Sequence, residues 1–409
     1  MSLRFLSSQW AASIYVGLVA LGLNILLARL LGPARFGDYG VALAAGALSG
    51  IFLDGGFKTL LLRERTLATG ALADLVPRLH AVAMGHALLT GAVMGSLSLL
   101  LFPDQRGLAI AVVACFSGVA LTQFVSGALR GEGRFAADAG WQAGVRTFSA
   151  AAILGALALG MRTPAGVFLA WAMGSLGAML LLPHGQTRFP RLEWHPEAYR
   201  AAAFLLWIDL ATVAYFRADM LLLKAMGVPT REIGQYVAAY RFVEALILLI
   251  TPVSLLIFRK LRLEWQDLQR LRRRMGRMLL VSGAAGILAA GLLAAGAHWV
   301  IGLAYGTAYG EAAGLLVILA CALLFILPNA VLTQAAIALN HERAYAVIAT
   351  MAAVVNVALN GWLIPRYGVK GAAWVTVATE GGLFVALIGY LAAQRRVVGV
   401  AATDAEIVP

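Results

Sequence analysis

Ionisable side chains stand inside several long apolar stretches of this sequence, where a charge is costly and usually faces a cavity or a partner. Two pairs have a spacing that permits neutralisation on one helix face. Asp54 and Lys58 are four residues apart, and Arg241 and Glu244 are three apart. Each pair is therefore open to two interpretations, an internal ion pair that eases membrane insertion or part of a site that binds a ligand.

Other charges have no neutralising neighbour at helical spacing. Arg146 needs a partner from another helix, from water or from a ligand, unless its side chain reaches the membrane interface. Arg217 follows Asp209 by two turns, and Asp219 lies on another face of the same helix. The partner of Arg217 is therefore an acidic residue on another helix, or a ligand. Glu380 is either a carrier of a coupling proton or cation, or a buried and protonated structural carboxyl.

The cations suit a substrate that bears phosphate, because guanidinium groups match phosphate oxygens in pairs. Amides could add hydrogen bonds to sugar hydroxyls, although helix packing also explains them, as an interfacial anchor explains Arg29. The candidate substrate-binding residues are Arg29, Lys58, Arg146, Arg217, Arg241, Asn24, Asn356 and Asn360. The candidate residues for coupling to H+ or Na+ are Asp54, Asp209, Asp219, Glu244 and Glu380.

The sequence offers no pattern for catalysis. It contains no nucleophile and base pair, no cluster of metal ligands and no phosphate-binding glycine loop followed by lysine. We therefore expect neither an enzyme nor a bound metal or cofactor, and no hydrolysis of ATP by this chain.

The elements that position these residues are long apolar helices. Of the 409 residues 61% are hydrophobic and 13% are charged, against roughly 25% charged in a soluble domain. A membrane span needs about 20 apolar residues, which predicts an all-α polytopic membrane protein with about twelve spans. These are residues 10–31, 39–62, 81–102, 108–129, 141–161, 165–182, 202–226, 233–258, 278–303, 312–339, 345–364 and 371–393.

The basic residues are distributed unequally across this predicted topology. About 20 lie on the side of the two termini and about 8 on the opposite side, so the positive-inside rule places both termini in the cytoplasm. The net charge of +12 is explained by topology, above all by the run from Arg259 to Arg277, which would lie near anionic headgroups. No nucleic-acid partner is expected.

An internal repeat divides the chain. The stretch LLARLLG at 26–32, followed by GDY at 37–39, recurs as LLLKAMG at 221–227 and GQY at 234–236. LTQ at 121–123 recurs at 332–334. We predict two parallel six-helix lobes, residues 1–183 and 201–393, joined by a cytoplasmic linker at 184–200 and followed by a cytoplasmic tail at 394–409. Transporters built from such repeats bind substrate at the repeat interface and alternate access by rocking.

Three segments carry a resemblance to a known family. LLARLLGPARFGDYG at 26–40, DMLLLK at 219–224 with IGQYVAAYRFVE at 233–244, and YGVKGAAW at 367–374 resemble the Wzx-type polysaccharide flippases. These belong to the MATE-like multidrug/oligosaccharidyl-lipid/polysaccharide exporter (MOP) superfamily. The resemblance implies two pseudo-symmetric six-helix lobes in a bacterial inner membrane.

It also implies a function. The protein would move a polyprenyl-pyrophosphate-linked oligosaccharide across the membrane for synthesis of O-antigen, capsule or exopolysaccharide, among membrane lipids and with a polysaccharide polymerase or chain-length regulator as candidate partners. One alternative is a cation-coupled multidrug antiporter, whose activity would depend on the acidic residues. The other is an integral-membrane polysaccharide polymerase or ligase, which the short predicted outer connections disfavour.

Overall fold

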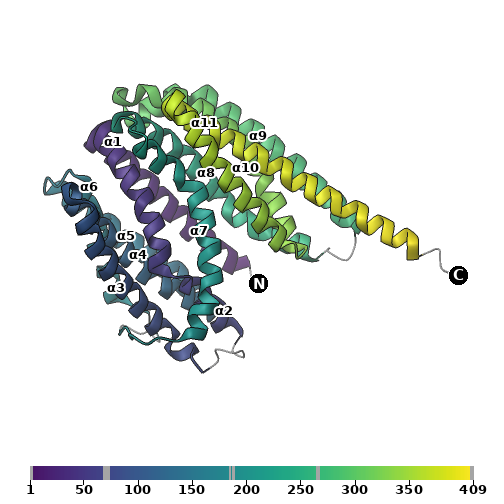
Figure 1. Ribbon diagram of the computed structural model, residues 1–409, viewed down its shortest axis with the longest axis horizontal. Coiled ribbons are helices and arrows are strands. Elements are labelled where there is room, and N and C mark those ends of the chain that lie inside the picture. Colours follow the sequence, from purple (N-terminus) through teal and green to yellow (C-terminus); the bar gives the residue numbers. More distant parts are fainter. Residues whose placement is uncertain (1–2, 68–73, 184–185, 187–188, 264–267, 406–409) are drawn as a thin grey trace. The chain divides into compact units, whose positions relative to one another are not determined.

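The computed structural model describes residues 3–67, 74–183, 186, 189–263 and 268–405. Within these residues all regular secondary structure is helical (Figure 1), which confirms the predicted all-α polytopic fold. The helices are α1 (Leu3–Asp54), α2 (Phe57–Leu67), α3 (Val76–Leu101), α4 (Arg106–Gly131), α5 (Phe135–Ala158), α6 (Pro164–Ala178), α7 (Pro196–Ala225), α8 (Thr230–Leu263), α9 (Leu268–Tyr305), α10 (Gly310–Ala338) and α11 (Glu342–Ala405), with short 3-10 turns at Pro103–Gln105, Met179–Leu181 and Thr307–Tyr309.

Two of these helices each contain a pair of predicted spans. In α1 the backbone turns at Gly32, whose φ of 72° suits glycine, and Pro33 then starts the second half with its fixed φ. In α11 the same role falls to Gly368, with φ of 55°. The predicted connections at 32–38 and 365–370 are thus sharp breaks between helical halves and not extended loops.

The second predicted span, residues 39–62, is not continuous. Gly55 and Gly56 have φ of 60° and 82° and separate α1 from α2. The apolar residues on both sides predict one span, although Asp54, Gly55 and Gly56 between them form a pattern typical of a turn. The break lies between Asp54 and Lys58, and it changes what this pair of charges can do.

Seven helical segments of the described residues are long and apolar enough to cross a membrane: Ala11–Asp54, Val76–Leu101, Pro103–Gly131, Pro164–Leu181, Gln269–Tyr305, Thr307–Ala338 and Glu342–Gln394. Because the first and last each hold two predicted spans, these segments account for all predicted spans except those in α5, α7 and α8. Those three helices carry Arg146, the α7 charges and the pair Arg241 and Glu244.

The contacts divide the chain into two compact units, Met1–Val237 and Ala238–Pro409. In the first unit, α4 packs against α1, α2, α3 and α6. In the second, α10 lies against both α9 and α11 (Figure 1). The predicted lobes, which rest on the sequence repeat, stay a prediction. Residues 184–185 and 187–188 of the predicted linker and 406–409 of the predicted tail lie outside the described residues, and α11 continues to Ala405.

The sequence repeat is visible in the backbone. Gly32 and Gly227 occupy equivalent positions in the two copies and have φ of 72° and 76°. Gly37 and Gly234 are also equivalent, and they pack the second half of α1 against the start of α8. A Cβ on Gly37 would lie 1.9 Å from the Thr230 carbonyl oxygen, and a Cβ on Gly234 would lie 1.9 Å from the Pro33 carbonyl oxygen. Only glycine permits this approach of two helix backbones.

Candidate functional site

The break between α1 and α2 is held by Asp54. Its carboxylate accepts hydrogen bonds from the backbone nitrogens of Gly56, at 3.0 Å, and Lys58, at 3.2 Å. Amides at the start of a helix lack partners within that helix, and an aspartate side chain satisfies them. The described hydrogen bonds of Asp54 therefore go to the backbone of α2 and not to the ammonium group of Lys58, although the two opposite charges are close enough to attract.

Helix α7 packs directly against this break. A Cβ on Gly56 would lie 2.3 Å from the carbonyl oxygen of Ala202 and 2.9 Å from the backbone nitrogen of Leu206. This close approach brings Asp209, one turn further along α7, within electrostatic range of Asp54. The structure thus places together three of the predicted site residues, Asp54, Lys58 and Asp209, which we call the break cluster.

The break cluster combines two carboxylates with one ammonium group, and its three side chains are half-buried. At Asp54 the attraction of the Lys58 charge is stronger than the repulsion of the Asp209 charge. Lys58 supplies a positive charge for an anionic ligand. The cluster therefore offers two carboxylates to a cationic ligand and one ammonium group to an anionic one.

Arg146 on α5 has an aromatic partner. Its guanidinium carbon lies 5.8 Å from the centre of the Trp171 ring on α6, a cation–π distance. Its Nε is buried and has no hydrogen-bond partner among the described residues. The sequence required a partner from outside α5, and within the first unit that partner is an indole ring.

Asp219 on α7 is bound inside the protein. One carboxylate oxygen accepts a hydrogen bond from the Met220 backbone nitrogen at 2.7 Å, and the other accepts one from the Tyr236 hydroxyl on α8. Only 5% of the Asp219 surface is exposed. The Asp219 carboxylate therefore links α7 to α8. Arg217, on the same helix as Asp219, is half-buried.

Asn24 and Arg29 lie on the first half of α1. The Asn24 amide nitrogen donates to the Ala20 carbonyl oxygen at 2.8 Å, while its Oδ1 is buried without a hydrogen-bond partner in the described part of the chain. Arg29 is exposed. Lys224, which ends the repeat-equivalent helix, pairs with Asp38 at 3.2 Å, also on an exposed surface.

In the second unit, Arg241 and Glu244 form the ion pair within α8 that their spacing allows. The charges of both residues also act on Tyr305 of α9. Arg241 is buried and Glu244 is half-buried. The pair therefore neutralises itself within α8, which is the structural interpretation of its spacing.

A buried polar group joins α10 to the two halves of α11. The Asn329 amide nitrogen donates to the Glu380 carboxylate at 2.8 Å and to the Glu380 carbonyl oxygen at 3.0 Å. The Asn356 amide nitrogen donates to the Thr379 hydroxyl at 3.1 Å, and the Asn360 amide nitrogen donates to the Asn356 side-chain oxygen at 2.9 Å. Oδ1 of Asn360, a residue with no exposed surface, lacks a hydrogen-bond partner among the described residues.

The predicted site residues thus fall into separate groups. Asp54, Lys58 and Asp209 lie together in the first unit, whereas Arg241 with Glu244, and Glu380 with the nearby amides, lie in the second unit. The partners Trp171 and Asn329 were missed by sequence reasoning, although Asn329 stands beside Pro328 inside an apolar helix and could have been noticed. In the described residues no group of three or more His, Cys, Asp or Glu side chains could hold a metal ion.

Comparison with known proteins gives one family and one fold. The profile of a family described as "Polysaccharide biosynthesis protein" matches residues 6–257. No curated protein matches the chain. The fold is similar to "Lipid II flippase MurJ, inward closed conformation", with 14% sequence identity, 95% of this chain and 87% of that chain covered, and a TM-score of 0.77.

Two further solved structures share the fold. A multidrug resistance MATE family transporter of the MOP superfamily, in an inward-facing conformation, has 14% identity, covers 98% of this chain and 96% of its own, and gives a TM-score of 0.63. A MOP superfamily transporter from Pyrococcus furiosus has 14% identity, covers 97% and 96%, and gives a TM-score of 0.62. At such low identity these likenesses establish the fold and not the substrate.

Proposed function

This chain belongs to the polysaccharide biosynthesis protein family, and on that premise we propose that it is a flippase for a polyprenyl-pyrophosphate-linked oligosaccharide. It would work in the bacterial inner membrane, with cytoplasmic termini, and serve the synthesis of O-antigen, capsule or exopolysaccharide by alternating access. The chain is a multi-pass membrane protein with the fold of MOP-superfamily transporters. The observation that carries the proposal is the break cluster, an interrupted membrane helix with charges of both signs.

A flippase must lower the cost of moving a charged headgroup through hydrocarbon. Lys58 is our leading candidate for the pyrophosphate, because it is the cation of the break cluster and its ammonium group can donate hydrogen bonds to phosphate oxygens. An anion next to Asp54 and Asp209 adds negative charge, which favours protonation of one carboxylate. Substrate binding would then be coupled to proton uptake, and the opposite leaflet would reverse both steps.

The other predicted residues take supporting parts in this proposal. Arg146, held by Trp171, and Arg217 and Arg29 would attract the anionic headgroup, and Asn24 would bind sugar hydroxyls through its buried Oδ1. Their role in binding is proposed from residue type and burial.

In the second unit, the amide and hydroxyl oxygens of Asn356, Asn360 and Thr379 are the hard ligands that Na+ accepts, and Glu380 lies in the same layer of polar residues. This group is a second candidate for ion coupling. Asp219 and Glu244 are weaker candidates, because their carboxylates already bind Tyr236 and Arg241.

The decisive experiment measures movement of the lipid. The purified protein is placed in liposomes with a fluorescent polyprenyl-pyrophosphate oligosaccharide, and accessibility of the label to an impermeant quencher is followed under an imposed proton or sodium gradient. We expect Lys58→Gln to slow flipping by roughly 10-fold or more, because a charge-assisted hydrogen bond is worth about 1.5–3 kcal/mol.

Lys224→Gln is the matched control, since it removes the same charge from an exposed ion pair with Asp38. It should flip the lipid at the wild-type rate. If Lys58→Gln flips as fast as wild type, the break cluster does not hold the pyrophosphate. If the wild type moves no lipid-linked glycan under either gradient, the flippase function itself is wrong.

A second function is favoured by one observation, the excess of carboxylates over ammonium groups in the break cluster. Such a site suits a multidrug antiporter for organic cations coupled to H+ or Na+. The same liposomes then accumulate a fluorescent organic cation, Asp54→Asn and Asp209→Asn abolish that uptake, and Lys58→Gln leaves it intact.

Chemical turnover of the glycan, as expected for a polymerase or ligase, would appear as a change in product mass.

A further inference from the structure

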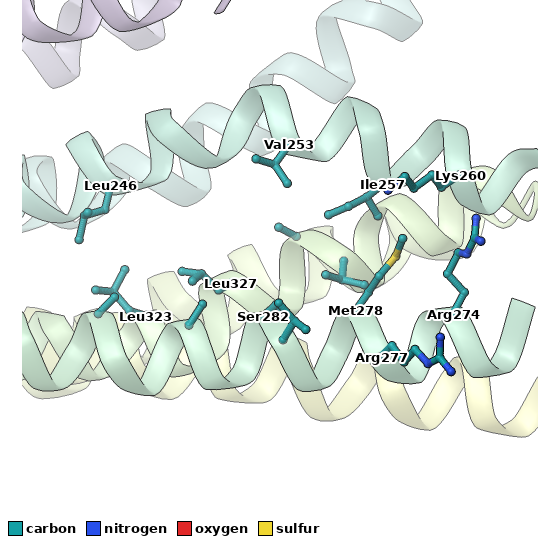
Figure 2. A pocket seen from close by; sticks show the side chains of 15 residues that line it. Leu246, Val253, Ile257, Lys260, Arg274, Arg277, Met278, Ser282, Leu323 and Leu327 are labelled. Carbon is teal, nitrogen blue, oxygen red and sulfur yellow. The ribbon is translucent and has the colours of Figure 1, made fainter.

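A cavity of about 590 Å³ lies between α8, α9 and α10 of the second unit (Figure 2). Its size is within the range of roughly 300–1,000 Å³ found for ligand pockets. It contains none of the residues discussed above as the candidate site. Its lining is mostly aliphatic and includes three basic residues, Lys260, Arg274 and Arg277.

The polarity of this cavity is divided along its length. Lys260, Arg274 and Arg277 gather at one end, whereas Leu246 and Leu323 lie at the other (Figure 2). Ser282 is the one neutral polar residue of the lining, and its hydroxyl bonds within its own helix to the Leu279 carbonyl oxygen. The cavity therefore offers three positive charges followed by an apolar trough.

The length of the trough matches one leaflet of a bilayer. Leu246 and Lys260 are separated by about 21 Å along α8, and Arg274 and Ala289 by about 22 Å along α9, at 1.5 Å per residue. Half of a bilayer with its headgroup regions measures roughly 20–22 Å. The charges thus lie at headgroup depth when the apolar end lies near the bilayer centre.

The charged end of the cavity is fixed by packing. Leu261 of α8 is buried in a cluster with Leu271 and Met275 of α9 and Leu332 of α10. Arg262 donates hydrogen bonds to the Ala338 carbonyl oxygen at 2.7 Å and to the Asn340 side-chain oxygen at 2.9 Å. Helices α8, α9 and α10 therefore pack together next to Lys260, and the cavity lies beside this contact.

We propose that this cavity binds an anionic phospholipid of the surrounding leaflet. The phosphate would lie against Lys260, Arg274 and Arg277, and one acyl chain would lie along the trough towards Leu323. Basic pockets between membrane helices are known to take such headgroups. The apolar length favours a lipid over free phosphate, and the site is independent of the transported substrate proposed above.

The first test compares two double variants of equal charge. The purified protein is exchanged into nanodiscs of phosphatidylglycerol and phosphatidylcholine in equal amounts, extracted gently, and the retained lipids are counted by native mass spectrometry. Lys260→Gln with Arg277→Gln should lower the preference for phosphatidylglycerol by roughly 25-fold. This estimate assumes that each basic residue near an anionic surface contributes about a factor of five. Arg272→Gln with Arg273→Gln removes two exposed charges of α9 outside the cavity and should keep the preference.

The second test fills the apolar trough without changing charge. Ala285→Trp places an indole in the cavity and should reduce the number of retained phosphatidylglycerol molecules by one. Ala284→Trp, at the neighbouring exposed position outside the cavity lining, should leave that number unchanged.

Several results would overturn the proposal. Equal retention in the two double variants would mean that no specific phosphate site exists, and an equal loss in both would mean that general surface charge selects the lipid. Displacement of the bound lipid by millimolar inorganic phosphate would make the cavity a phosphate site. A polyprenyl phosphate added in equal amount could also displace phosphatidylglycerol from the wild type. If it does so, but not from the variant with Lys260→Gln and Arg277→Gln, the cavity binds the carrier lipid instead.

Discussion

Two carboxylates that stand inside apolar stretches, Asp54 and Asp219, have different surroundings in this protein. Asp54 accepts backbone hydrogen bonds at a helix break and still faces the charges of Lys58 and Asp209. Asp219 is enclosed and accepts its hydrogen bonds from Met220 and Tyr236. The first arrangement places a carboxylate at a helix break beside two other charges, and the second makes a carboxylate a link between α7 and α8.

The structural role of Asp219 leads to a prediction for its phenolic partner. Tyr236→Phe removes one donor and leaves a buried carboxylate oxygen without it. We expect the free energy of unfolding to fall by about 1–3 kcal/mol, measured by thermal unfolding in detergent. Tyr367→Phe is the matched control, since Tyr367 is 62% exposed. Equal unfolding temperatures for the two variants would show that the hydroxyl contributes nothing to stability.

At the scale of single residues, sequence spacing predicts partners on the same helix but not partners on other helices. The ion pair of Arg241 and Glu244 follows from three residues of separation. The contact of Arg146 with Trp171 does not, because the two side chains come from different helices and their meeting depends on helix packing. The same holds for Asp54 and Asp209, which are 155 positions apart in the sequence numbering.

At the scale of elements, the crossing of α1 and α8 depends on two glycines. Gly37 and Gly234 each face a backbone carbonyl of the other helix at a distance that no side chain could share. Both have ordinary helical backbone, so their value lies in their lack of a Cβ. The crossing lies within the first unit and joins the repeat-equivalent starts of two helices.

Enlarging either glycine should separate these helices. We expect Gly234→Leu to lower the free energy of unfolding by more than the roughly 1–3 kcal/mol typical of overpacking, because the obstacle is rigid backbone. Gly155→Leu on α5 is the control, since nothing lies within 4 Å of a Cβ at that exposed position. Thermal unfolding of both variants in the same detergent is the measurement, and an unchanged unfolding temperature for Gly234→Leu would refute the close crossing.

The helix breaks show which element boundaries a sequence can reveal. The turn at Gly32 is predicted by the glycine and proline pair that follows an apolar run. The break at Gly55 and Gly56 also has a turn pattern, Asp-Gly-Gly at 54–56, but Phe57 and the leucines of α2 continue the apolar run and favour one span. What the sequence does not contain is the packing of Gly56 against the backbone of α7. The break cluster could therefore be predicted as a set of charges but not as a geometry.

At the scale of the whole molecule, the fold could be predicted because hydropathy, the repeat and the charge distribution act over the full chain. Each membrane helix must satisfy its own backbone, so apolar length alone identifies it. Helices α5, α7 and α8 carry ionisable residues within their apolar runs, and the repeat identifies α7 and α8 by their equivalence to both halves of α1. The substrate could not be predicted in this way, since it depends on side chains that meet across helices.

The orientation in the membrane remains a prediction from charge, and it can be tested with single cysteines. In a variant with Cys115→Ala and Cys321→Ser, a cysteine is introduced by Asp104→Cys before α4 or by Arg343→Cys at the start of α11, both at exposed positions. Because the positive side faces the cytoplasm, an impermeant maleimide applied to intact cells from the periplasmic side should label the Asp104→Cys variant. It should reach the Arg343→Cys variant only after the inner membrane is opened. The reverse pattern would invert the topology, and with it the direction in which the proposed substrate is first bound.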